Sequence, residues 1–291
     1  MGDLIVGEEA LNRYIGAVDT PPLVRPEKRS TNYPALARAA MAGRPPGSPV
    51  QGEHPKFIVC VGDGEHRTEM IVKFSPPATT PIGQRWADLL VAEHLAHIML
   101  AERGIPACRS TVLRFEDRVF LEVERFDRIG AEGRRGAVSL LALDAARYGR
   151  LDSWAACAQR LAADALLSAQ DAEHVQLLDL FGALIANTDR HFGNITLFDR
   201  YEGPLELAPA YDMLPMLFAP QSDQIVERQY EPARPTAASL SLWPHARALA
   251  EAYWERLTQE PSLSGEFREL SGRCLAALRA VSSRGVLASS A

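Results

Sequence analysis

The stretch that decides the fold is Asn187-Thr188-Asp189-Arg190-His191-Phe192-Gly193-Asn194, which Tyr211-Asp212-Met213-Leu214-Pro215 follows further along the chain. It places an aspartate five residues before an asparagine, and a second aspartate beyond a short hairpin. This is the spacing at which protein kinases place a base and two magnesium ligands. The stretch therefore predicts a site for phosphoryl transfer.

The chemistry of the reaction suggests roles for four polar residues of these two motifs. Phosphoryl transfer needs a carboxylate beside the attacking hydroxyl, with metal ions around the phosphates. Asp189 is the candidate base, while Asn194 and Asp212 offer the oxygen ligands that Mg²⁺ prefers. Either aspartate alone would suit a helix-terminal turn or an N-cap, but the pair with its hairpin favours a site. His191 is a candidate catalytic residue, and a packed loop histidine is the alternative.

Composition limits the class of protein. A chain of 291 residues that is 47% hydrophobic can form two lobes. Its net charge of -6 argues against a protein whose main function is to bind nucleic acid directly. The start lacks the basic and apolar regions of a signal peptide, and no window is apolar for long enough to span a membrane. We expect a cytoplasmic protein. The four cysteines stand far apart, which favours unpaired, packed thiols over a zinc site or disulfides.

Hydrophobic periodicity predicts an α+β protein of two lobes, with a β-rich lobe over residues 1–127 and a helical catalytic lobe over 128–291. The proline-rich arm 19–49 follows an amphipathic piece at 4–16 and allows a short helix at 34–41. The first lobe is expected to contain strands 57–61, 70–74, 110–115 and 118–123 and a helix over 84–103. The second is expected to contain helices 140–148, 154–167, 175–186, 246–257 and 267–281 and a hairpin of strands 195–198 and 205–207.

Two charged residues of the first lobe suit a nucleotide site. Lys73 ends an apolar run, so a strand would carry it and point its ammonium at the phosphates. Glu93 lies in the following predicted helix and can pair with that ammonium. A surface lysine and a solvated glutamate are the alternatives. Upstream, the small-residue loop 47–56 could cradle phosphate with its backbone N–H groups.

Six motifs, taken in order, resemble the HipA family of bacterial serine/threonine kinases, the toxin half of HipA–HipB toxin–antitoxin pairs. They are GSPVQGEHPKF (47–57), IVKF (71–74), the helix with Glu93, VERFDR (123–128), NTDRHFGN (187–194) and AYDMLP (210–215).

This resemblance implies a phosphate-binding loop and a nucleotide site. Ser48, Gly52 and Lys56 would belong to the loop, and Lys73 would hold the phosphates of ATP. Ser48 would also be a regulatory autophosphorylation site, where roughly two negative charges beside the ATP phosphates would inhibit the kinase.

The resemblance also implies a hinge for the base and sugar of the nucleotide. Glu124 and Phe126 would meet adenine, and Asp127 would lie near the ribose. Asp189 would be the base, with His191 in the same catalytic loop. Asn194 and Asp212 would bind Mg²⁺.

The expected function is therefore that of an ATP- and Mg²⁺-dependent serine/threonine kinase that inhibits growth. The family implies a protein substrate in the translation machinery, such as an aminoacyl-tRNA synthetase, and a HipB-like helix-turn-helix antitoxin. DNA would be reached mainly through a partner, or through a domain outside this sequence, because the sequence has no convincing helix-turn-helix region. The alternatives are a pseudokinase that only binds a partner and a small-molecule kinase of the aminoglycoside type.

Overall fold

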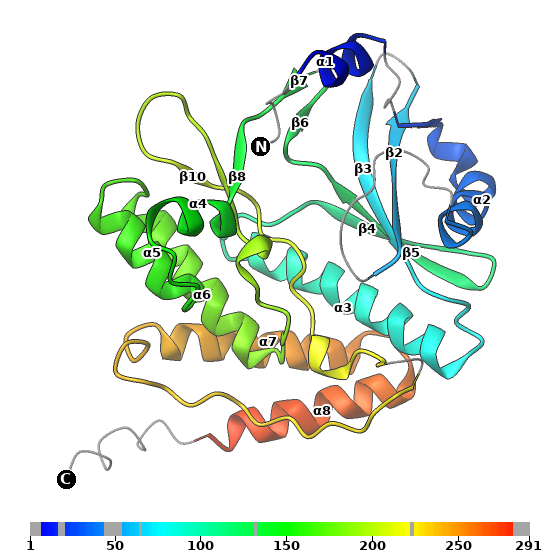
Figure 1. Ribbon diagram of the computed structural model, residues 1–291. Helices are drawn as coiled ribbons and strands as arrows, with labels where there is room; N and C mark the ends of the chain where they lie inside the picture. Colours follow the sequence, from blue (N-terminus) through cyan, green and yellow to red (C-terminus); the bar gives the residue numbers. More distant parts are fainter. Residues whose placement is uncertain are drawn as a thin grey trace.

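The computed structural model describes residues 7–16, 21–43, 54–63, 66–130, 133–221 and 224–281. A β-rich first part stands above a helical second part, with α3 (Pro81–Glu102) running beneath the strands (Figure 1). This confirms the predicted α+β fold with two lobes. The predicted boundary between residues 127 and 128 falls where β5 leads into a short hairpin.

The large sheet has five strands in the order β1-β2-β3-β5-β4. Only β1 is parallel to its neighbour, and the other pairs are antiparallel. The four strands expected in the first lobe are all present as β2, β3, β4 and β5. In this register Lys56 lies directly opposite Lys73. The strands are β1 (Leu23–Val24), β2 (Lys56–Gly62), β3 (Arg67–Phe74), β4 (Ser110–Phe115) and β5 (Arg118–Glu124).

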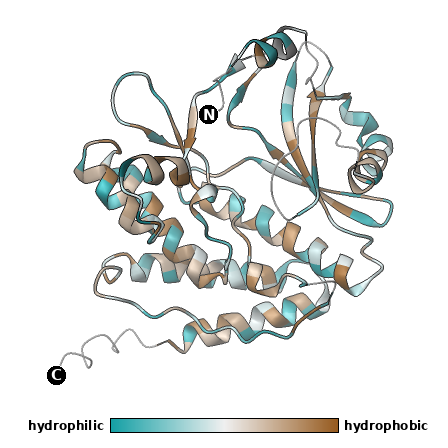
Figure 2. Ribbon diagram, in the orientation of Figure 1, coloured by the Kyte–Doolittle hydropathy of each residue, from teal (hydrophilic) through white to brown (hydrophobic). Residues whose placement is uncertain are grey.

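A helix covers each face of this sheet, because side chains of a strand alternate between its faces. Along β5, Leu121 and Val123 join the core that contains α3. Phe120 joins a smaller core with Tyr33 and Ala37 of α2 (Arg29–Met41) on the other face. Strand β2 is mostly brown in Figure 2, as expected for a strand covered on both faces.

The helix expected over 34–41 is longer than the sequence indicated. The 3₁₀ turn Pro26–Lys28 leads directly into α2, which begins at Arg29 and contains Pro34. A proline inside a helix removes one backbone hydrogen bond. Burial of Tyr33, Pro34 and Ala37 against the sheet offsets this loss, and propensity alone could not show that burial. The amphipathic piece expected at 4–16 forms α1 (Glu8–Ile15).

A buried polar cluster fixes α2 to the sheet and supports a prediction about stability. The Tyr33 hydroxyl donates to Glu122, which is 3% exposed and also accepts from Arg29 at 2.5 Å. Tyr33→Phe removes one donor from a buried carboxylate, so we expect unfolding free energy in urea to fall by about 1–3 kcal/mol. Tyr148→Phe is the matched control, because its hydroxyl donates to Asp164 in an exposed contact. Equal losses in the two variants would contradict the buried role.

Serine and threonine caps begin most of the long helices. Thr80, Ser139, Ser153, Ser168 and Ser264 each accept a hydrogen bond from the backbone N–H three residues ahead. The helical part contains α4 (Leu140–Arg147), α5 (Trp154–Ala163), α6 (Ala169–Leu184), α7 (Trp243–Gln259) and α8 (Gly265–Arg279), with 3₁₀ turns at Phe192–Asn194 and Met216–Phe218.

Most differences from the predicted elements lie at helix ends and in very short strands. Helix α5 ends four residues early, and α6 begins six residues early, because Ala165 adopts a left-handed conformation with φ 57° and Ser168 caps the next helix. The hairpin between the two aspartate motifs is confirmed. It consists of β9 (Thr196–Phe198) and β10 (Glu206–Leu207), which β8 (Ala137–Ser139) extends to three strands, and β6 (Arg128–Ile129) pairs with β7 (Gly133–Arg134).

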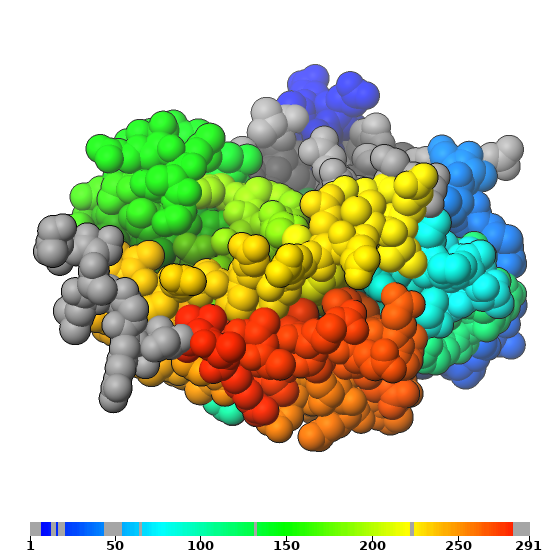
Figure 3. Space-filling model, turned by 90° about the horizontal axis from the view of Figure 1, so that it is seen from below, coloured from blue at the N-terminus to red at the C-terminus, as the bar shows by residue number. Residues whose placement is uncertain are grey.

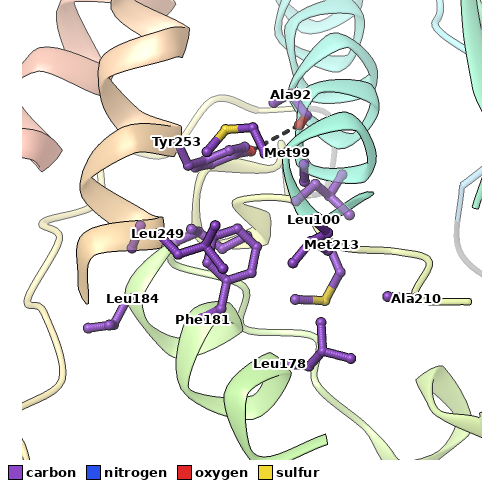
Figure 4. Packing of buried hydrophobic residues seen from close by; sticks show 14 of the residues in the cluster. Ala92, Met99, Leu100, Leu178, Phe181, Leu184, Ala210, Met213, Leu249 and Tyr253 are labelled. Atoms are coloured by element: carbon purple, nitrogen blue, oxygen red, sulfur yellow. Dashed lines mark hydrogen bonds between the residues drawn. The ribbon is translucent and has the colours of Figure 1, made fainter. Parts of the chain in front are cut away.

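The main core joins α3 to the helical part. In Figure 4, Tyr253 of α7 donates to the carbonyl of Ala92 on α3 at 3.1 Å, and Phe181 of α6 lies beside them. Met213 points into the same core. In Figure 3 the yellow-to-gold residues that follow it lie against the orange and red helices α7 and α8. The segment that carries Asp212 is therefore anchored in the interior.

The cysteines are all free and buried, which confirms the expectation of unpaired, packed thiols. Among the described residues no helix is both long and apolar enough to cross a bilayer.

Candidate active site

Three charged residues from separate motifs meet at the inner end of the cleft between strands and helices. Lys73 Nζ on β3 lies 2.6 and 2.7 Å from the two carboxylate oxygens of Glu93 on α3. The same ammonium donates to Oδ1 of Asp212. Glu93 is 0% exposed and Lys73 is 8% exposed, so neither is the surface residue that the alternative interpretation required. The strand, the helix and the loop after β10 thus converge on one cation.

The electrostatics of this cluster keep the lysine charged. Burial opposes the charge of Lys73, but Asp212 and Glu93 outweigh it and raise the pKa of the ammonium. Burial raises the pKa of the Glu93 carboxyl despite its contact with Lys73. Burial also opposes ionisation of Asp212, but Lys73 prevails and lowers the pKa of that carboxyl. Asp212 therefore stays ionised, which suits it to bind a cation.

Asp212 has an unusual backbone that helps to place its carboxylate. Its φ of 54° lies in the left-handed region, which aspartate tolerates better than most side chains. The Asn187 amide donates to the Asp212 carbonyl at 3.1 Å, and Met213 is buried in the core. Such a conformation is kept only where the surroundings enforce it, which is common at functional sites.

The catalytic-loop residues are held by hydrogen bonds within the motif itself. Asn187 Oδ1 accepts from the Asp189 N–H at 3.0 Å, and Asn194 Nδ2 donates to the Asp189 carbonyl at 2.9 Å. Asn194 is 5% exposed, whereas just over half of the Asp189 side-chain surface is exposed. The backbone of Asp189 is therefore fixed while its carboxylate faces the open cleft. An asparagine held through its nitrogen keeps its oxygen for another partner.

His191 acts on the loop through its own backbone contacts. Its Nδ1 accepts from the Gly193 N–H at 3.0 Å, and its carbonyl accepts from Trp154 Nε1 at 3.1 Å. Its Nε2 lies 4.0 Å from Asp189 Oδ1, and the ring is more than half exposed. This is not the packed loop histidine of the alternative interpretation. The His191 ring stabilises the turn at Gly193, and it lines the cleft together with Asp189.

The predicted hinge residues lie at and just after the end of β5 and line the same cleft. Phe126 packs on Tyr211, with ring centroids 5.8 Å apart, and on Phe198 at 5.5 Å. Two guanidinium groups hold Asp127, because Arg125 contacts both of its oxygens and Arg128 contacts Oδ2 at 2.7 Å. Burial opposes ionisation of Asp127, but Arg125 lowers the pKa of its carboxyl. Glu124 ends the strand and lies 3.9 Å from Arg109.

Lysine is rare in this chain, and its distribution marks the cleft. Only Lys28, Lys56 and Lys73 occur in the sequence, and the last two line the cleft. Burial and the charge of Lys73 lower the pKa of Lys56. Lys28 is exposed. Lys56 is thus the more nucleophilic of the two cleft amines, since the pKa of Lys73 is raised.

This difference predicts selective acylation of Lys56. A limiting amount of a neutral acylating reagent should modify Lys56 faster than Lys28, because burial and the charge of Lys73 lower the pKa of Lys56 and favour its uncharged, nucleophilic form. Peptide mapping by mass spectrometry measures both rates, with Lys28 as the internal control. ATP with Mg²⁺ should slow only the Lys56 reaction. Equal protection of both lysines would contradict a nucleotide site in this cleft.

The structure brings all the described candidate residues to one cleft. Its volume is about 710 Å³, which suits a ligand of nucleotide size. Ser48 and Gly52 lie outside the described residues, so their roles stay predictions. The candidates that line the cleft are Lys56, Lys73, Glu93, Glu124, Phe126, Asp127, Asp189, His191, Asn194 and Asp212.

The donor set fits a magnesium ion that the phosphates of a nucleotide would help to hold. The described residues contain no group of three or more His, Cys, Asp or Glu that could hold a metal by themselves. Magnesium in kinases is bound through one or two protein oxygens together with the nucleotide phosphates. Asp212 and Asn194 offer a carboxylate and an amide of that kind on the cleft wall. These residues therefore fit the predicted ion.

Sequence reasoning missed two positioning residues inside the motifs it used. Asn187 is fully buried and links the Asp189 and Asp212 segments. Tyr211 donates to the Gly193 carbonyl at 2.7 Å and lies 2.9 Å from Thr196 Oγ1, which ties the catalytic loop to β9. The sequence signal that could have identified them is their position next to the charged residues: Asn187 lies two residues before Asp189, and Tyr211 directly precedes Asp212. Amide and phenol groups carry no charge that would single them out.

A curated protein is similar in sequence to most of this chain. Toxin YjjJ of Escherichia coli (strain K12) is 37% identical over 276 residues, which cover 93% of this chain and 61% of that protein. The chain therefore spans about three-fifths of the length of the curated relative it matches.

Two solved structures share the fold at low sequence identity. The HipA toxin of Shewanella oneidensis MR-1, solved with HipB and operator DNA, gives a TM-score of 0.53 at 18% identity and covers 79% of this chain and 63% of its own. The proinflammatory kinase CtkA of Helicobacter pylori gives a TM-score of 0.51 at 12% identity, and the match covers 80% of this chain and 89% of the CtkA chain. Residues 48–277 match the HipA-like C-terminal domain family. The chain belongs to the HipA-like C-terminal domain family.

Proposed function

We propose that this chain is a serine/threonine protein kinase that transfers the γ-phosphoryl group of ATP, with Mg²⁺, to a protein hydroxyl. The observation that carries the proposal is the convergence of Glu93 and Asp212 on Lys73 in the cleft that also holds Asp189 and Asn194. A lysine, a helix glutamate, a base and two metal ligands in this arrangement are the parts of a kinase site. The proposed lobes are 1–127 and 128–291.

Each residue has a defined task in the proposed reaction. Lys73, oriented by Glu93, holds the α- and β-phosphates, and Asp189 accepts the proton of the attacking hydroxyl. Asp212 and Asn194 would hold Mg²⁺, which neutralises charge on the phosphates when it is bound. At the other end of the cleft, Glu124, Phe126 and Asp127 would receive the adenosine.

The charge of the cleft favours a protein acceptor over an aminoglycoside. An aminoglycoside carries several ammonium groups and needs an acidic pocket. The lining is mixed in charge rather than acidic, because Lys56, Arg125, Arg128 and Arg134 lie among its carboxylates. The Asp127 carboxylate is already held by two guanidinium groups. Intact Lys73 and its partners also favour an enzyme over a pseudokinase.

The family suggests the biological setting of the proposed activity. We infer a cytoplasmic toxin that inhibits growth by phosphorylating the translation machinery, with an aminoacyl-tRNA synthetase as one substrate of this class. A HipB-like helix-turn-helix antitoxin would restrain it, since the Shewanella HipA was solved with HipB and operator DNA. DNA contact would come through that partner. Ser48 would be the inhibitory phosphosite, so Ser48→Asp is expected to lose ATP turnover.

The experiment that tests this function follows labelled phosphate in a bacterial lysate. The purified chain is incubated with γ-³²P-labelled ATP, Mg²⁺ and nuclease-treated lysate, and the acid-insoluble protein is separated from acid-soluble small molecules. We expect new label in protein, and loss of it when EDTA removes Mg²⁺. Label only in the acid-soluble fraction would favour the small-molecule kinase. No labelling above the lysate alone, together with ATP binding, would favour the pseudokinase.

A further inference from the structure

Two histidines lie directly behind the Lys73–Glu93 pair. His94 and His97 of α3 each place Nδ1 next to the same hydroxyl, Ser110 Oγ on β4, at 2.9 and 3.0 Å. His97 is 1% exposed and lies one turn after Glu93, with its Nε2 3.8 Å from Glu93 Oε1. The described residues provide no hydrogen-bond acceptor for this nitrogen within normal distance. The contacts therefore form a line from β4 to the glutamate that orients Lys73.

Hydrogen counting assigns the tautomer of His97. If Nε2 were unprotonated, its lone pair would face the Glu93 carboxylate, which is unfavourable in a buried site. The proton therefore lies on Nε2, and Nδ1 accepts the single hydroxyl hydrogen of Ser110. His94 must then donate its own Nδ1–H to Ser110 Oγ. The positions of the three hydrogens, on His97 Nε2, Ser110 Oγ and His94 Nδ1, are therefore all determined.

His97 stays neutral in this environment, which keeps the line in one state. Burial and the charge of Lys73 lower the pKa of the His97 imidazole to about 3. A cationic ring would carry protons on both nitrogens and could not accept from Ser110. The neutral ring instead presents one N–H to the carboxylate and one acceptor to the hydroxyl.

We propose that His97 is a positioning residue for phosphoryl transfer: Ser110 and His94 hold it in the Nε2–H tautomer, and its N–H keeps the Glu93 carboxylate turned toward Lys73. Glu93 contacts Lys73 with both oxygens, so a rotation of the carboxylate would loosen the ammonium that is to hold the phosphates. Residues that orient a functional side chain in this way commonly matter for affinity or rate. The expected effect on kinetics rests on the proposed kinase function. The tautomer of His97 and its contact with Glu93 do not depend on that function.

Two isolated replacements at His97 separate positioning from packing. His97→Gln keeps an N–H near the position of Nε2, whereas His97→Phe keeps an aromatic ring without any N–H. We expect the phenylalanine variant to lower kcat/KM for ATP by about 10–100-fold, mainly through KM, and the glutamine variant to remain close to wild type. His245→Phe, at an exposed position of α7, is the control. Equal activity of the phenylalanine variant and wild type would overturn the proposal, as would equal losses in both His97 variants.

A double-mutant cycle tests the route through Ser110. Ser110→Ala removes the hydroxyl that selects the tautomer, so it should lower kcat/KM in wild type. In the His97→Phe background it should have little further effect, because the effect of Ser110 passes through His97. Additive losses would contradict this route.

A spectroscopic test separates this inference from the kinase proposal. Long-range ¹H–¹⁵N correlation spectra of protein labelled in its 7 histidines report the tautomer of each ring, and the His97→Gln variant assigns the His97 signals. We expect His97 as Nε2–H and His94 as Nδ1–H, with the His97 tautomer released in Ser110→Ala. A protonated Nδ1 on His97 in the wild-type protein would overturn the inference. A chain that shows the expected tautomers but transfers no phosphate would instead refute the kinase function alone.

Discussion

Asp189→Asn is expected to lower the rate of phosphoryl transfer by about 10²–10⁴-fold, the usual contribution of a general base. The Asp189 backbone is held by Asn187 and Asn194, so the replacement removes a proton acceptor and leaves the loop in place. The Asp189 side chain is about half exposed, and this isosteric change should not unfold the protein. Binding of ATP with Mg²⁺, measured by calorimetry, should change little.

The control for this prediction is Asp117→Asn, the same chemical change at an exposed turn between β4 and β5. It should transfer phosphate at the wild-type rate. If Asp189→Asn retained that rate as well, Asp189 would not be the base. If it lost ATP binding to the same extent as transfer, its role would be to hold the nucleotide.

Lys73→Met should have the second large effect, because it removes the cation on which Glu93 and Asp212 converge. Loss of one preorganised donor to a reacting phosphate typically lowers the rate by about 10²–10³-fold. The replacement also leaves the buried Glu93 carboxylate and the partly buried Asp212 carboxylate without their partner. We therefore expect a loss of unfolding free energy of about 1–3 kcal/mol beside the loss of transfer.

A second variant separates these two consequences. In Lys73→Met/Glu93→Gln a neutral amide replaces the unpaired buried carboxylate, so stability in urea should recover while phosphoryl transfer stays low. Lys28→Met, at an exposed position, is the matched control and should change neither quantity. Recovery of transfer in the double variant would contradict the assigned role of the ammonium.

The sequence predicted the elements whose cause is local. The antiparallel pair β2 and β3 followed from two apolar runs around a glycine turn, and α3 followed from its apolar period and the glycine at 104. The sequence also predicted that Asp189, Asn194 and Asp212 lie close together. The short hairpin between the two motifs reverses the chain, so Asp212 returns to the neighbourhood of Asp189 and Asn194. Lys73 and Glu93 were predicted as a pair, and the structure confirms their contact.

Features that depend on tertiary contacts could not be predicted in this way. The start of α2 at Arg29 depends on Tyr33 reaching Glu122, which is 89 residues away in the chain. The strand β8 has only three residues, and it is recognised as a strand by its pairing with β9 rather than by a sequence pattern. The line from Ser110 to His97 joins a strand to a helix, and neither histidine stood out from the helix pattern.

The most direct test of the central claim compares wild type with Asp189→Asn in the transfer of labelled γ-phosphate to protein, followed by acid hydrolysis and phosphoamino acid separation. Both forms should bind ATP with Mg²⁺. We predict phosphoserine or phosphothreonine label with wild type and a loss of about 10²–10⁴-fold in its rate of appearance with Asp189→Asn. Equal rates in the two forms, or no phosphoserine and phosphothreonine with wild type, would contradict the account.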